Sequence, residues 1–112
     1  MQIITNTISL AELKQMAQSL GGLVKAVVDI EKEIMAVDAE LQADEESLLL
    51  ANGSNNDSLW GINIYPDLTD DSWLEFDSMI NLRPQQNNLS RGIGNPVIRE
   101  KIKQVVNKLV PR

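Results

Sequence analysis

Apolar residues near the start of the chain recur at the spacing of an α-helix. The stripe that this spacing predicts consists of Leu10, Leu13, Ala17 and Leu20. Ser9 and Glu12 form a capping box at its start, in which the Ser9 hydroxyl accepts a hydrogen bond from the Glu12 amide. Gly21 and Gly22 end the helix, because glycine adopts the left-handed conformation of a helix C-terminus at little energetic cost.

The C-terminal segment repeats the helical pattern. Asn95 and Pro96 are typical of a helix start, with Asn as the N-cap and Pro in the first helical position. The apolar stripe that follows consists of Ile98, Ile102, Val105 and Leu109. A shorter helix is expected over residues 44–51, capped by Asp44 and ended by Gly53.

Four segments alternate apolar and polar residues with the period of two that is typical of β-strands. The first two form an expected hairpin, with one strand at residues 23–30 and its partner at 34–41. Two further strands are expected at residues 60–65 and 73–82, and Pro66 ends the first of them. The alternation predicts a sheet with one apolar face and one polar face.

The expected order of elements is helix, hairpin, short helix, strand, strand, helix. Because strands and helices do not alternate strictly, the sequence predicts an α+β fold with two layers. We expect about four mainly antiparallel strands, with the two longer helices on one face and the other face uncovered. The chain has 112 residues and no internal repeat, which predicts a single domain over residues 1–112.

Charge is divided unevenly along the chain. Residues 1–80 hold fifteen acidic residues and three lysines, a net charge of −12, whereas residues 81–112 hold one acidic residue and seven basic ones, a net charge of +6. We expect the basic C-terminal part to lie against carboxylates, either within the chain or across a homodimer. The acidic remainder would repel a nucleic-acid backbone, which argues against a nucleic-acid partner.

The composition excludes several kinds of chemistry. Hydrophobic residues make up 43% of the chain and charged residues 23%, so we expect a folded globular domain. Cys and His are absent, so one chain cannot form a disulfide, a Cys or His metal site, a Ser-His-Asp triad or a Cys-His pair. No nucleophile motif is present, and together these features argue against an enzyme. We expect no bound cofactor.

The N-terminal residues do not resemble a secretory signal, because they carry no basic side chain and only a short apolar stretch. No apolar run approaches the roughly 20 residues that span a bilayer. We therefore expect a cytoplasmic protein that has no membrane partner.

Carboxylates gather on the polar face of the predicted sheet. The strand assignments place five of them there: Asp29, Asp38, Glu40, Glu75 and Asp77. Clustered carboxylates bind Mg²⁺ or Ca²⁺, and the residues expected to hold such an ion are Asp29, Glu40 and Asp77. The alternative is a solvated acidic face, or a surface that meets basic residues of another chain. No calcium-loop motif supports the metal site.

The loop that begins at Arg83 and contains Arg91 is the second candidate site. A guanidinium offers a planar fork to a carboxylate or phosphate, and the amides between the arginines supply donors and acceptors. The residues expected to bind a small anionic ligand are Asn63, Asn81, Arg83, Asn87 and Arg91. In the alternative, the arginines pair with the acidic face and the amides satisfy backbone groups.

Several segments resemble a family of small uncharacterised bacterial proteins. They are Val27–Glu31, Glu40–Glu46, Leu59–Asn63 with Tyr65-Pro66, and Glu75–Asn81 continuing through Arg83-Pro84 to Ser90-Arg91. The similarity covers nearly the whole chain and implies a single-domain bacterial protein of no stated activity. It implies that the family's polar positions correspond here to Asp29, Glu40, Asn63, Asp77, Asn81, Arg83 and Arg91. The chain departs from the family at Gln42, where the family pattern has a histidine.

Two functions from different classes fit these observations. The first is a non-catalytic binding or regulatory module that acts through a protein partner or through self-association. The second is a metal-assisted hydrolase or a protein that binds an anionic ligand, using the acidic sheet face and the Arg83–Arg91 loop. The lack of histidine and cysteine and the division of charge favour the first.

Overall fold

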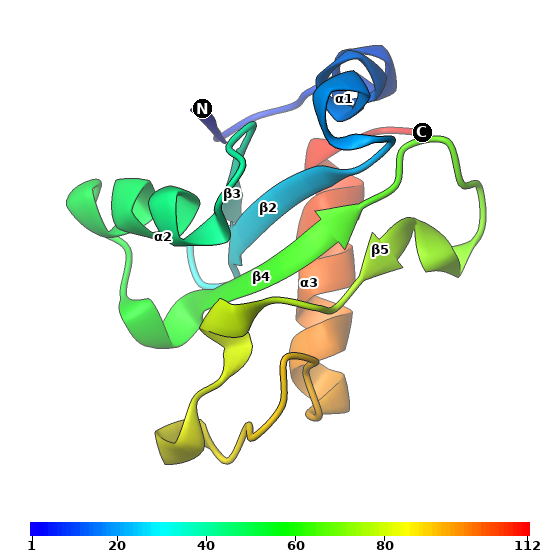
Figure 1. Cartoon of the computed structure of the whole chain (residues 1–112). Helices are drawn as coiled ribbons and strands as arrows, with labels where there is room; N and C mark the ends of the chain where they lie inside the picture. The colour runs from blue at the N-terminus through cyan, green and yellow to red at the C-terminus, as the bar shows by residue number, and fades with distance from the viewer.

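The computed structural model describes all 112 residues, Met1 to Arg112, and contains one five-stranded antiparallel sheet (Figure 1). The strands lie in the order β1-β3-β2-β4-β5. Their bounds are β1 Gln2–Ile4, β2 Val24–Asp29, β3 Ile34–Val37, β4 Leu59–Ile64 and β5 Leu74–Glu75. The central strand β2 pairs with β4 along its whole length. The α+β class is confirmed, with one strand more than the sequence predicts.

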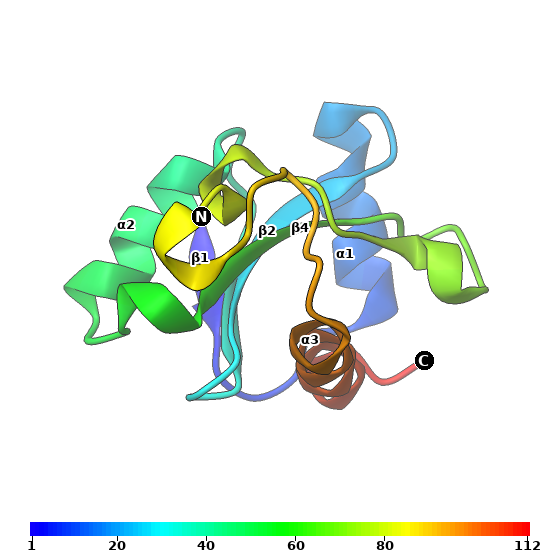
Figure 2. The same cartoon turned by 90° about the horizontal axis from the view of Figure 1, so that it is seen from below.

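Three α-helices cover the two faces of the sheet. Their bounds are α1 Leu10–Ala17, α2 Gln42–Ala51 and α3 Pro96–Leu109. Figure 2 shows α1 and α3 on one side of the sheet and α2 on the other. Single 3-10 turns occupy Gln18–Leu20, Asn56–Ser58, Asp71–Trp73, Met79–Asn81 and Pro84–Gln86. The sheet is therefore the middle of three layers rather than one of two.

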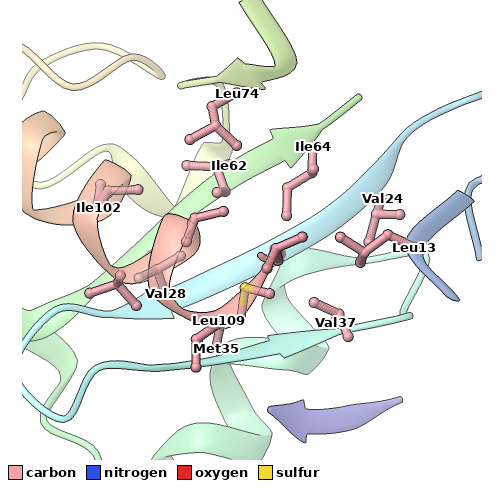
Figure 3. Packing of buried hydrophobic residues seen from close by; sticks show 14 of the residues in the cluster. Leu13, Val24, Val28, Met35, Val37, Ile62, Ile64, Leu74, Ile102 and Leu109 are labelled. Atoms are coloured by element: carbon pink, nitrogen blue, oxygen red, sulfur yellow. The ribbon is translucent and has the colours of Figure 1, made fainter. Parts of the chain in front are cut away.

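The larger core fills the space between the sheet and the helices α1 and α3. Alternate residues of neighbouring strands point into it, as Figure 3 shows for Val28, Met35 and Ile62. Leu13 of α1 and Ile102 of α3 pack into the same core, and neither has exposed surface. The predicted placement of α1 and α3 on one apolar face is confirmed, whereas the expectation that these are the two longer helices is wrong, because α1 has 8 residues and α2 has 10.

A second, smaller core lies under α2. Leu49 of α2 packs with Val27, Ala36 and Leu59, and none of the four has exposed surface. The expectation that this face is uncovered is wrong. Strands β2 and β3 carry apolar residues on both faces, which is typical of strands that are covered on both sides.

Two predicted strands are shorter in the structure. The strand expected over residues 34–41 ends at Val37, because the φ angle of +72° at Asp38 breaks the extended conformation. The strand expected over residues 73–82 is limited to β5. The chain then forms the turn at Met79–Asn81, where the Ser78 hydroxyl accepts a hydrogen bond from the Ile80 amide at 3.3 Å.

The predicted starts of α1 and α3 are confirmed. Ser9 Oγ accepts a hydrogen bond from the Glu12 amide at 3.1 Å, and the Asn95 side chain accepts one from the Val97 amide at 2.9 Å. No helix of the chain combines the length and the apolar character needed to cross a bilayer.

The start of α2 differs from the prediction. The helix begins at Gln42, and its N-cap is Leu41 rather than Asp44. Leu41 has no side-chain acceptor, so no side chain caps the first turn. The first amides of any helix lack partners within the helix. In α2 the Asp44 amide donates to the Leu41 carbonyl at 3.1 Å, so the amides free to meet an external acceptor are those of Gln42 and Ala43.

We predict that Ser9→Ala lowers the free energy of unfolding by about 1 kcal/mol, because a first-turn amide of α1 loses its acceptor. Urea unfolding of the two proteins measures the difference. Ser19→Ala is the matched control, since the Ser19 hydroxyl donates to the Met16 carbonyl and caps no amide. An equal loss in both variants would contradict the capping role of Ser9.

Candidate functional site

A row of polar side chains crosses the α2-facing side of the sheet at one end. Lys25 on β2 lies opposite Asn63 on β4, and Asn63 lies opposite Glu75 on β5. Directly opposed residues of antiparallel strands project from the same face, within reach of one another. The row therefore places a cation, an amide and a carboxylate side by side on three neighbouring strands.

Hydrogen bonds fix this row and tie it to α2. The Asn63 amide donates to Glu75 Oε1 at 2.8 Å, and the Tyr65 hydroxyl donates to the same oxygen at 3.1 Å. Gln42 Nε2 donates to the Ile62 carbonyl at 2.8 Å and to Asn63 Oδ1 at 3.3 Å. Burial raises the pKa of Tyr65, and the bond to Glu75 raises it further, so the hydroxyl stays protonated as a donor.

A groove of about 200 Å³ opens beside the row, at the start of α2. Its lining consists of Lys25, Leu41, Gln42, Ala43, Ser78, Met79, Ile80 and Arg91. Two cations line the groove and no carboxylate does, although the chain as a whole has a net charge of −6. Leu41 and Met79 add apolar surface, since they are exposed to 58% and 62%.

The two cations of the groove are each held by one contact. Lys25 Nζ donates to the Glu40 carbonyl oxygen at 2.8 Å, which occupies one of its three donors. Arg91 Nε donates to Asp77 Oδ1 at 2.7 Å, and the terminal guanidinium nitrogens of Arg91 have no partner within the chain. Both side chains therefore keep donors for a further acceptor.

The segment that carries Arg91 is fastened to β4 by a side chain rather than by a strand. Asn81 Oδ1 accepts from the Gly61 amide at 2.8 Å, and Asn81 Nδ2 donates to the Gly61 carbonyl at 2.9 Å. Asn81 Nδ2 also donates to the Arg91 carbonyl at 3.0 Å. Asn88 joins the same loop by donating to the Asn81 carbonyl at 2.7 Å and to the Gly92 carbonyl at 2.8 Å.

Glu45 lies on the buried face of α2 and has no exposed surface. Burial raises the pKa of its carboxyl group from 4.5 to about 9, and this effect outweighs the opposing bond from the Ala39 amide and the charge of Lys25. Glu45 Oε2 accepts from the Ala39 amide at 3.2 Å, whereas Oε1 has no hydrogen-bond partner. At neutral pH Glu45 is therefore an uncharged acid.

The structure separates the residues predicted to bind an anionic ligand. Asn63 and Arg91 both contact Asp77, beside the groove. Asn81 is buried and satisfies backbone groups, as the alternative interpretation of the loop expects. Asn87 is exposed on the surface of the loop, in a left-handed conformation with a φ angle of +58°.

Arg83, the remaining member of that set, lies away from the groove and is 4% exposed. Its Nη2 forms an ion pair with Glu46 Oε2 at 3.4 Å, and its guanidinium lies 4.8 Å from the centre of the Trp60 ring. Burial lowers the pKa of Arg83, while the charge of Glu46 opposes that shift. The contacts of Arg83 thus join α2 to the loop.

The basic C-terminal part is expected to meet carboxylates either within the chain or across a homodimer, and the structure contains such ion pairs within the chain. Besides the pairs of Arg83 and Arg91, Lys108 of α3 lies 3.6 Å from Glu33. Basic residues of segment 81–112 thus meet carboxylates of segment 1–80 without a second chain. The homodimer form stays a prediction.

The residues predicted to hold a metal ion lie in different surroundings. Asp29 is buried at the end of β2, where it accepts from two turn amides at 2.9 Å and from the Ser54 hydroxyl at 2.6 Å. Asp77 pairs with Arg91, and Glu40 is exposed just before α2. The structure contains no group of three or more acidic side chains placed to share an ion.

Sequence reasoning misses three residues of this region, Lys25, Gln42 and Glu45. A signal exists for two of them, because Gln42, Glu45 and Leu49 have the spacing of one helix face. That face packs on the sheet, so its two polar members are held inside. Lys25 gives no local signal, since its nearness to Arg91 arises only from the tertiary fold.

These features define a small single-domain α+β protein with a cationic groove beside a buried, uncharged carboxyl group. The chain belongs to the family described as "Protein of unknown function (DUF5674)", whose model matches residues 2–109. The resemblance to an uncharacterised family is thereby confirmed. No curated protein and no solved structure matches the chain.

We predict that Glu45→Gln removes a pH dependence of stability. Between pH 4.5 and about 9 the unfolded Glu45 is ionised and the folded one is not, so the unfolded state binds fewer protons and folding stability falls as pH rises. The fall is about 1.4 kcal/mol per pH unit, or about 3 kcal/mol at pH 7.

Urea unfolding of both proteins from pH 5 to pH 8 measures this effect. The free energy of unfolding of the Glu45→Gln variant should increase steadily relative to that of the wild type as pH rises. Asp44→Asn on the same helical turn is the matched control, because Asp44 is exposed. A constant difference between Glu45→Gln and the wild type across this range would show that Glu45 is ionised in the folded protein.

Proposed function

We propose that this protein is a binding module that takes a carboxylate-bearing segment of a protein partner into the groove at the start of α2. The observation that carries the proposal is that Lys25, Arg91 and the uncapped first turn of α2 all line this groove. Each of the three offers hydrogen-bond donors or positive potential, and an anion is the ligand that suits all of them.

The surroundings of the groove support an anionic ligand in spite of the acidic sequence. Asp77, the nearest carboxylate to Arg91, is already engaged by the Nε of that arginine. The first turn of α2 contains two acidic residues. Glu45 is uncharged at neutral pH and does not repel an anion, and Asp44 does not line the groove. The positive end of the helix dipole then adds to the two side-chain charges.

The size and the apolar rim of the groove favour the end of a polypeptide. Small-molecule sites usually have volumes of roughly 300–1,000 Å³. The groove, at about 200 Å³, is smaller and accommodates the last residue of a polypeptide, with its terminal carboxylate and side chain. Leu41 and Met79 offer contacts to an apolar side chain next to that carboxylate. Capture of a C-terminal carboxylate by backbone amides is an established mode of peptide recognition.

The test uses an N-acetylated tetrapeptide that ends in leucine with a free carboxylate, titrated into ¹⁵N-labelled protein and followed by NMR. We expect the amide signals of Gln42 and Ala43 to shift in a saturable way. The same peptide with a C-terminal amide is the matched ligand control and should leave these signals in place. Equal shifts with both peptides, or none with either at millimolar concentration, would refute the proposal.

Single variants test whether Lys25 and Arg91 bind the peptide carboxylate. Lys25→Gln and Arg91→Gln should each weaken binding about tenfold, because a hydrogen bond to a charged group contributes about 1.5–3 kcal/mol. Lys101→Gln removes an exposed charge from α3 and should leave the affinity unchanged. If all three variants weakened peptide binding equally, the effect would come from the overall charge of the protein, and the groove would not be the binding site. Tighter binding of phenyl phosphate than of the peptide would contradict the choice of a carboxylate.

A further inference from the structure

Strand β1 leaves one edge of the sheet open. It pairs only with β3, in the register Gln2 opposite Val37 to Ile4 opposite Met35, and no strand lies on its other side. Natural proteins block such edges with proline, lysine or a bulge, or keep them short. Strand β1 is short, at three residues, but contains no proline, lysine or bulge. The unpaired backbone groups of β1 can therefore receive a further strand.

A hollow of about 620 Å³ lies at this end of the sheet, between the chain end before β1 and helix α2. It is lined by Met1, Asp38, Ala39, Glu40, Asp44, Ser47 and Leu48. Asp38, Glu40 and Asp44 are exposed, and neither Glu40 nor Asp44 has a cationic partner for its side chain. Two cations lie beside these residues: the amino group of Met1, 3.8 Å from Asp38, and Lys25, whose Nζ donates to the backbone carbonyl of Glu40 at 2.8 Å.

We propose that the free edge of β1 binds an extended basic segment of a partner protein, which adds a sixth strand to the sheet. Hydrogen bonds to the main chain of β1 supply the affinity, and side chains at alternate positions supply the specificity. Side chains of the added strand that point toward α2 meet the three carboxylates, so lysine or arginine fits there. Leu48 takes the aliphatic part of such a side chain.

Charge also decides against a second copy of this chain as the occupant. In a symmetric antiparallel pair of β1 strands, the two sets of Asp38, Glu40 and Asp44 would lie at opposite ends of the pair. Residues 2–9 of the second copy have no basic side chain to place beside them. A second copy therefore leaves these carboxylates without cationic partners, whereas a basic segment supplies them.

The test uses a heptapeptide of alternating valine and lysine, followed by NMR on ¹⁵N-labelled protein at low salt. We expect saturable shifts and slowed amide exchange within residues 2–4. A second heptapeptide has the same side chains with alternate backbone nitrogens methylated, which removes the donors and keeps the charge. A third replaces lysine by glutamate. Both should fail to protect these amides. Equal binding of the methylated peptide, or no binding of the first peptide, would overturn strand addition.

Side-chain variants test the role of charge. The double variant Glu40→Gln with Asp44→Asn should weaken the valine–lysine peptide about tenfold, since each exposed charge pair contributes a few-fold in affinity. Glu100→Gln, on α3 and outside this hollow, is the matched control and should have no effect. Unchanged affinity in the double variant would overturn the basic nature of the partner.

The groove proposal and the edge-strand proposal can be refuted independently of each other. The Arg91→Gln variant should bind the valine–lysine peptide as the wild type does, because Arg91 does not line the hollow beside β1. A changed affinity for this peptide in Arg91→Gln would place the basic peptide at the groove and overturn the edge site. The carboxylate peptide, in turn, is expected to leave the amides of β1 unchanged.

Discussion

The contact on which the candidate site depends is the pair of hydrogen bonds between Asn81 and Gly61. The Asn81 side chain bonds both the amide and the carbonyl of one residue on β4, as the backbone of a neighbouring strand would. Because Gly61 has no side chain, the chain beyond β5 can approach it closely. A Cβ atom there would lie 2.5 Å from the Ser78 side chain, nearer than two carbon atoms can approach. The irregular segment is thus held against the sheet without a ladder of backbone hydrogen bonds.

The consequences reach both walls of the groove. Asn81 also binds the Arg91 carbonyl, so the same side chain that holds the segment sets the position of Arg91. On the opposite wall, Gln42 donates to the Ile62 carbonyl and to Asn63, which fixes the first turn of α2 on β4, next to Gly61. Burial of the uncharged Glu45 beneath α2 lowers stability at neutral pH. The cationic character of the groove follows in part from that same neutrality.

Sequence patterns reveal the parts of this fold that depend on local periodicity. Ser9 and Asn95 signal the starts of α1 and α3, and apolar stripes signal their lengths, because caps and the 3.6-residue period act over a few neighbouring residues. The segment 73–82 alternates like a strand, yet Ser78 and Asn81 direct it into a turn through bonds that are absent from any strand pattern. Arg83 and Arg91 attract attention as a loop pair, but one is buried against Trp60 and the other faces the groove. The nearness of Lys25 to Arg91 depends on strand order and on the docked segment, and neither is encoded in the spacing of residues.

Residue-resolved hydrogen exchange of the Asn81→Ala variant tests the central role of this contact most directly. Removing the side chain leaves the Gly61 amide and carbonyl without partners, so the account predicts faster exchange at Gly61 and across residues 78–91, with the β2–β3 ladder still protected. Asn107→Ala, at an exposed position of α3, should leave both regions as in the wild type. Unchanged protection of Gly61 and residues 78–91 in Asn81→Ala would contradict the account.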